Sequence, residues 1–77
     1  MPDYVPIACA SHERLEFAVL KQRRLHLVCQ EVGARDEFDV MPLDVYTRDG
    51  AEWLRASKDN GEEVILRLDV LLDFQEI

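Results

Sequence analysis

The chain lacks the residues from which most metal and cofactor sites are built. Its two cysteines, Cys9 and Cys29, form no CxxC pair. Neither belongs to a quartet of cysteines and histidines with zinc-ligand spacing, so a structural zinc is not expected. The three glycines are dispersed and make no phosphate-binding loop. We therefore expect no metal, no cofactor and no catalytic residues.

Long apolar runs are missing as well. No stretch approaches the roughly 20 apolar residues of a membrane span. The opening residues, MPDYVP, have neither the basic nor the apolar region of a signal peptide. A cytoplasmic protein with two reduced thiols is the expectation. The length of 77 residues suits a single domain, residues 1–77, with one small core.

Basic residues are scarce. Nine Lys and Arg stand against sixteen Asp and Glu, which gives a net charge of −7. Such a chain repels nucleic-acid phosphates and anionic membranes, and it is steered toward a basic protein surface. We expect no direct nucleic-acid binding, no membrane binding and a monomer when free. The predicted loops agree, because Arg35, Arg48 and Lys58 are outnumbered there by acidic residues.

One helix is predicted near the start of the chain. Residues 1–10 form an extended arm, because Pro2 and Pro6 disfavour a helix. Ser11 is a plausible N-cap for a helix over residues 11–21, with Glu13 in its first turn. Two helix faces follow from the 3.6-residue period: an apolar face of Leu15, Ala18, Val19 and Gln22, and an acidic face of His12, Glu13, Glu16 and Leu20.

Alternating apolar residues predict five strands within residues 24–77. Pro42 is expected to end the second strand or to kink it at a sheet edge. Asn60 and Gly61 suit a type I′ hairpin turn. The strands cover residues 24–32, 36–41, 51–57, 62–68 and 71–77, and the inward side chains are Leu25, Leu27, Cys29, Phe38, Val40, Val64, Leu66, Leu68, Leu72 and Phe74.

The element order indicates a fold class. One N-terminal α-helix followed by five short strands in a mostly β chain is typical of Sm-like and SH3-like folds, and this order favours the Sm-like version. We expect a small curved five-stranded sheet or barrel, whose closure would remove the exposed strand edges. A fold alone indicates no activity.

Few residues could carry chemistry. His12, His26, Cys9 and Cys29 are the candidates for a nucleophile or an imidazole base. Cys29 falls on the apolar side of its strand and is interpreted as core, and His26 falls on the polar side. We expect no enzyme. Two alternatives stay open at this point: an Sm-like RNA-binding or ring-forming module, and a small hydrolase or redox domain built on Cys9.

Several short pieces of the chain together resemble one family. Tyr4-x-Pro6-Ile7-x-Cys9 and Leu15-Glu16-x-Ala18 resemble the opening of the Rof family, small Rho-binding antiterminators also called YaeO. No piece is a strong motif by itself, but they are collinear from Tyr4 to Phe74. The later pieces are Asp44, Thr47-Arg48, Glu52-Trp53-Leu54, Leu66-Arg67-Leu68-Asp69 and Phe74.

The resemblance implies a function and a partner. A member of this family would bind transcription termination factor Rho at its N-terminal RNA-binding region and inhibit Rho-dependent termination. An acidic protein can compete for such a basic surface by offering carboxylates where phosphates would lie. The positions that match the family's contact residues are Glu13, Glu16, His12 and Arg48, whereas Ala10, Ser11, Arg14 and Asp49 depart from the family's pattern.

Overall fold

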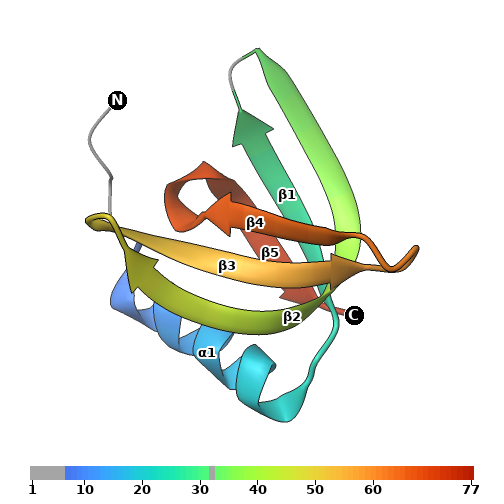
Figure 1. Ribbon diagram of the computed structural model, residues 1–77, viewed down its shortest axis with the longest axis horizontal. Helices are drawn as coiled ribbons and strands as arrows, with labels where there is room; N and C mark the ends of the chain where they lie inside the picture. Colours follow the sequence, from blue (N-terminus) through green and yellow to red (C-terminus); the bar gives the residue numbers. More distant parts are fainter. Residues whose placement is uncertain (1–6, 32) are drawn as a thin grey trace.

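The fold consists of one helix and a five-stranded antiparallel sheet, so the predicted mostly β class is confirmed. The computed structural model describes residues 7–31 and 33–77 (Figure 1). The predicted extended arm lies mainly outside these residues. The elements are helix α1 (Cys9–Lys21), strands β1 (Leu25–Glu31), β2 (Ala34–Arg48), β3 (Ala51–Lys58) and β4 (Glu63–Arg67), a 3₁₀ turn (Leu68–Val70), and strand β5 (Leu71–Glu76).

Strand β2 gives the sheet its curvature. Its first half pairs with β1 and its second half with β3, and Figure 1 shows the bend between the halves. The register of β2 against β3 shifts between Pro42 and Asp44, which marks a bulge. Pro42 does not end β2, which continues to Arg48, but the predicted kink at an edge is confirmed. The pairing of β1 with β2 stops at Val40, so at Pro42 the strand is paired on one side alone, with β3. The bulge accommodates a residue that has no N–H for the ladder.

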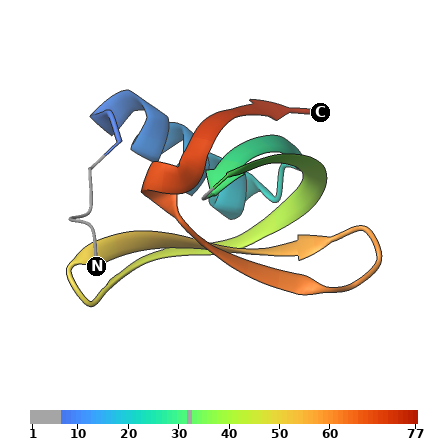
Figure 2. The same ribbon diagram turned by 90° about the horizontal axis from the view of Figure 1, so that it is seen from above.

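Of the two predicted forms, a curved sheet or a barrel, the structure has the curved open sheet. Its strand order is β4-β3-β2-β1-β5. Within residues 7–31 and 33–77, β4 and β5 do not pair with each other, and each forms one edge of the sheet. Figure 2 shows β5 on the same side of the molecule as α1, with the β2–β3–β4 hairpins on the other side. The edge strand β5 thus runs beside the helix.

The core lies between α1 and the concave face of the sheet. Leu15 and Ala18 of the helix are buried, and α1 packs mainly on β2. The alternation predicted for β1 is confirmed, because its inward side chains are all at most 3% exposed. The core cluster consists of Leu15, Ala18, Leu25, Leu27, Cys29, Val40, Leu54, Ala56, Leu68 and Phe74.

The helix begins earlier than predicted. Its N-cap is Ala8, which makes no side-chain capping bond, and the backbone N–H of His12 donates to the Ala8 carbonyl at 3.0 Å. Ser11 therefore lies inside the helix, and Glu13 lies beyond the first turn. At the other end Gln22 adopts the left-handed conformation with φ 54°, so it ends the helix instead of extending the apolar face.

Two side chains depart from the predicted alternation. Leu72 is 53% exposed although it was expected to point inward. The pairing of β5 with β1 goes from Val28↔Asp73 to Cys29↔Leu71, so Leu72 is skipped at a bulge that follows the 3₁₀ turn. Val28, which was not among the predicted inward side chains, is only 8% exposed.

The type I′ turn predicted at Asn60 and Gly61 is wrong, and this geometry occurs in the other hairpin turn beside β3. Asp49 and Gly50 both have positive φ, 53° and 74°, so the type I′ geometry lies between β2 and β3. In the next hairpin only Gly61 has positive φ, at 88°. There the Gly61 N–H donates to the Lys58 carbonyl at 2.9 Å, which is a type I turn followed by a glycine bulge.

Candidate functional site

His12 lies in an acidic cluster where α1 meets β3. Its Nδ1 atom is 2.9 Å from Oε1 of Glu16, one helical turn away, and its Nε2 atom contacts Oε2 of Glu52 on β3. The structure therefore brings together His12 and Glu16, two of the predicted contact residues, and it places Glu52 in the same cluster. Sequence reasoning missed Glu52 because no short-range pattern places the start of β3 against the helix.

Glu13 and Arg48 do not join this cluster as one binding surface. Glu13 is exposed and borders a small hollow beside His12, but it also lines a larger cavity on the other side of α1. Arg48 lies at the end of β2, with its side chain 75% exposed and its Nε atom 3.7 Å from a carboxylate oxygen of Asp49. The Trp53 indole N–H donates to the Arg48 carbonyl at 2.9 Å, so the backbone is held while the charge faces solvent.

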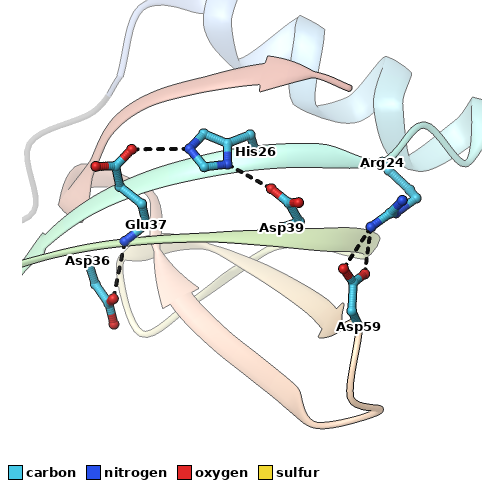
Figure 3. Close-up of polar contacts among 6 residues, drawn as sticks. All are labelled: Arg24, His26, Asp36, Glu37, Asp39 and Asp59. Carbon is cyan, nitrogen blue, oxygen red and sulfur yellow. Dashed lines mark hydrogen bonds and ion pairs between the residues drawn. The ribbon is translucent and has the colours of Figure 1, made fainter.

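A second histidine cluster lies on β1 and β2 (Figure 3). Nδ1 of His26 is 2.7 Å from Oδ1 of Asp39, and its Nε2 is 3.2 Å from Oε1 of Glu37. Hydrogen bonds from these two carboxylates, that of Asp39 first, raise the pKa of His26 above its ordinary value of 6.5. Beside them Arg24 donates to both carboxylate oxygens of Asp59, at 2.7 and 2.8 Å.

The His26 cluster predicts a pH dependence of stability. Since the folded-state pKa of His26 is raised, its stabilising contribution is fully present below 6.5 and is lost as pH rises through the folded-state value. We expect the melting temperature of the wild type, relative to His26→Gln, to fall as pH rises from about 5.5 to about 8.5. Thermal unfolding at fixed ionic strength measures this difference. A difference that stays constant over this range would contradict the prediction.

A cavity lies between α1 and the edge strand β5. It has a volume of about 520 Å³. Leu25 and Phe74, both nearly fully buried, form its apolar interior, and Phe17 of the helix lines it while remaining 52% exposed. We call this feature the α1–β5 groove; its lining residues are Ala10, Glu13, Arg14, Phe17, Leu25, Phe74 and Glu76.

Charge is distributed unevenly around the α1–β5 groove. Glu13 and Glu76 line it from α1 and β5. The one basic lining residue, Arg14, is already engaged: its guanidinium lies 4.6 Å from the centre of the Phe74 ring and donates to the Phe74 carbonyl at 3.3 Å. The groove thus combines an apolar interior with two carboxylates that have no ion-pair partner among the described residues.

A smaller cavity continues along β5. Its volume is about 220 Å³, and it shares Arg14 and Phe74 with the α1–β5 groove. Leu71, Leu72 and Asp73 line it from β5. Two hollows therefore lie along the same edge strand, with Arg14 common to both. Neither was predicted, because their walls come from residues about 60 positions apart, such as Arg14 and Phe74.

The two cysteines occupy different environments. Cys9 is exposed at the first position of α1, and Cys29 is buried in the core as predicted. Over residues 7–31 and 33–77 no cluster of three or more histidine, cysteine, aspartate or glutamate side chains could hold a metal ion. Over the same residues the single α-helix is too short and too polar to cross a membrane.

Comparisons with known proteins identify a fold. No family model and no curated protein matches the chain. Among solved structures, the chain is similar to proteasome accessory factor B/C (PafBC) of Arthrobacter aurescens, with a TM-score of 0.80 and 21% sequence identity over 92% of this chain. The match covers 12% of that much longer protein. At this identity the similarity shows the fold alone.

This match overturns the predicted family. The assignment to the Rof family is wrong, because the structural match over 92% of the chain is to PafBC, a different protein. The predicted function, inhibition of Rho-dependent termination, is wrong with it. Rho binding is unsupported, so the contact roles given to Glu13, Glu16, His12 and Arg48 lose their basis.

The reason for the error lies in what the resembling residues do. Leu15 and Ala18, which carried one piece of the resemblance, are buried against the sheet. Leu68 is fully buried, and the Arg67 Nε–H donates to Asp69 at 2.7 Å across the 3₁₀ turn. These positions are demanded by the helix-and-sheet fold, so unrelated chains with this fold can share them in the same order.

Proposed function

We propose that this chain is a non-catalytic protein-interaction module that binds a cationic, apolar segment of a partner protein in the α1–β5 groove. The observation that carries the proposal is the 520 Å³ apolar cavity lined by the half-exposed Phe17. Binding cavities typically measure about 300–1,000 Å³ and combine apolar walls with a few polar groups. The α1–β5 groove has both properties.

The energetics favour a large apolar side chain as the anchor. Covering a Phe or Leu side chain fully contributes about 1.5–3 kcal/mol. An anchor in the groove would cover the exposed part of Phe17 and would contact Leu25 and Phe74 on the inner walls. Aromatic neighbours add to this when their rings pack edge to face or offset. One well-seated anchor can therefore dominate the affinity.

The charges favour lysine or arginine beside that anchor. Glu13 and Glu76 line the groove, and the whole chain carries a net charge of −7. Complementary charge speeds association and disfavours acidic partners. The same charge disfavours nucleic acid and anionic membranes. The partner we propose is a protein segment with an apolar anchor and adjacent basic residues.

A non-catalytic role is supported by the state of the candidate chemical groups. Both ring nitrogens of His12 and of His26 contact carboxylates, so neither imidazole is poised beside a nucleophile. In PafBC the same fold occupies only a small part of a longer chain, which suits a module that works through its neighbours. A cytoplasmic location with reduced thiols belongs to this proposal.

A displayed library of random heptapeptides tests the proposal. We expect wild-type protein to enrich peptides that carry one large apolar residue with Lys or Arg close to it. An enriched peptide, synthesised and titrated by calorimetry, should bind more weakly as salt rises, because exposed charges are screened beyond about 8–10 Å at physiological ionic strength. No enrichment, or enrichment of acidic peptides, would overturn the proposal.

Charge reversal should weaken the binding of such a peptide about tenfold. The double variant Glu13→Lys and Glu76→Lys replaces two attractive contacts, each worth about 0.2–1 kcal/mol, by repulsion. The matched control is Asp36→Lys with Glu63→Lys, which reaches the same net charge at residues that do not line the groove. Equal weakening by both double variants would show a long-range charge effect instead of contacts in the groove.

A further inference from the structure

We infer that the partner segment binds as an added β-strand, paired with the open edge of β5. This inference rests on the proposed function, and it specifies how the segment is held. Extended peptides commonly bind by adding to an exposed sheet edge, where backbone hydrogen bonds supply affinity and pockets for alternate side chains supply specificity. The α1–β5 groove lies along such an edge.

The pairing of β5 with β1 shows which backbone groups face outward. The Ile77 N–H donates to the Arg24 carbonyl at 3.1 Å, so residues 77 and 24 form a hydrogen-bonded pair. In an antiparallel ladder such pairs alternate with non-bonded ones, whose N–H and C=O groups point to the other side. Glu76 pairs with Leu25 and Phe74 with Leu27, so Phe74 and Glu76 turn their backbone groups toward the open edge.

Arg14 confirms this orientation with a contact of its own. Its guanidinium donates to the Phe74 carbonyl at 3.3 Å from the side opposite β1. A long basic side chain lying over an edge strand is a common protection against unwanted strand pairing. Arg14 thus stands where the carbonyl of β5 would meet an added strand, and a bound segment would displace it from Phe74.

The two cavities match the side-chain spacing of a strand. Successive side chains of a strand point to opposite faces, so alternate residues, about 7 Å apart, face the same way. The α1–β5 groove and the smaller cavity follow one another along β5 and share Arg14 and Phe74. An added strand would direct its alternate side chains toward α1 and these hollows. The remaining side chains would face solvent.

A scan of single N-methyl groups along an enriched heptapeptide tests this inference. Replacing an amide hydrogen by a methyl group removes a donor and blocks the approach of a neighbouring strand. We expect N-methylation at alternate positions to weaken binding tenfold or more, and at the positions between them to change it less than threefold. Calorimetry with wild-type protein measures each affinity.

Hydrogen exchange in the protein supplies a second readout. The bound peptide should slow exchange of the Phe74 and Glu76 amide hydrogens and leave those of the other edge strand, β4, unchanged. Uniform tolerance of N-methylation, or a helical bound peptide, would overturn strand addition while leaving the proposed function intact. The proposed function itself would be refuted if no peptide were enriched, or if no enriched peptide lost affinity when the α1–β5 groove was mutated.

Discussion

Replacing Leu54 by alanine is expected to lower the free energy of unfolding by about 2–5 kcal/mol. Leu54 is fully buried in β3 and belongs to the core cluster. The change removes buried apolar contacts and leaves a cavity that neighbouring backbone can only partly fill. A domain of this size has a total stability of roughly 4–11 kcal/mol, so a large part of it would be lost.

Urea unfolding followed by tryptophan fluorescence measures this effect, with Trp53 as the probe. The matched control is Leu72→Ala, because Leu72 is 53% exposed at the β5 bulge. We expect the control to change stability by at most about 0.5 kcal/mol. A Leu72→Ala effect as large as that of Leu54→Ala would mean that the bulge assigned to β5 is incorrect.

Phe17→Ala is expected to reduce the affinity for an enriched peptide about 30-fold or more. Truncating an aromatic anchor at the centre of an interface typically costs at least 2 kcal/mol of binding energy. Phe17 is the half-exposed aromatic wall of the α1–β5 groove, so its removal opens the cavity on the helix side. Calorimetric titration of the wild type and the variant with the same peptide gives the ratio.

Leu20→Ala is the matched control for this prediction. Leu20 lies on the same helix and is 76% exposed, but it does not line the groove. Both substitutions give the helix the residue that favours it most, so both variants should fold as the wild type does. If Leu20→Ala reduced the affinity for the peptide as much as Phe17→Ala does, the docking surface would lie elsewhere on α1.

Local periodicity predicted most of the fold. The two-residue period placed Leu25, Leu27 and Cys29 in the core, and it predicted five strands in the correct order along the chain. The prediction failed where a non-local feature changed which residues of a strand face the core. The second strand runs past its predicted end at residue 41 because its later part pairs with β3 through a bulge, and Leu72 turns outward because the 3₁₀ turn and a second bulge shift the register.

The candidate site was harder to predict than the fold. The 3.6-residue period of the helix was enough to place Leu20 on the exposed face, but no local sequence pattern distinguished Phe17 from a core residue. The groove exists because the last strand of the sheet returns beside the first helix, and only the topology brings Arg14 and Phe74 within contact distance. Pairing of His12 with Glu52 has the same origin. Short motifs, by contrast, suggested a family that the structural comparison contradicts.

The most direct test of the groove as the docking surface is a chemical-shift titration of ¹⁵N-labelled protein with an enriched heptapeptide. We expect the largest shifts at Phe17, Leu25, Phe74 and Glu76, which line the α1–β5 groove. Amides around Asp36 and Asp59, which do not line the groove, should move little. Largest shifts in that second region, with the groove unchanged, would contradict the account.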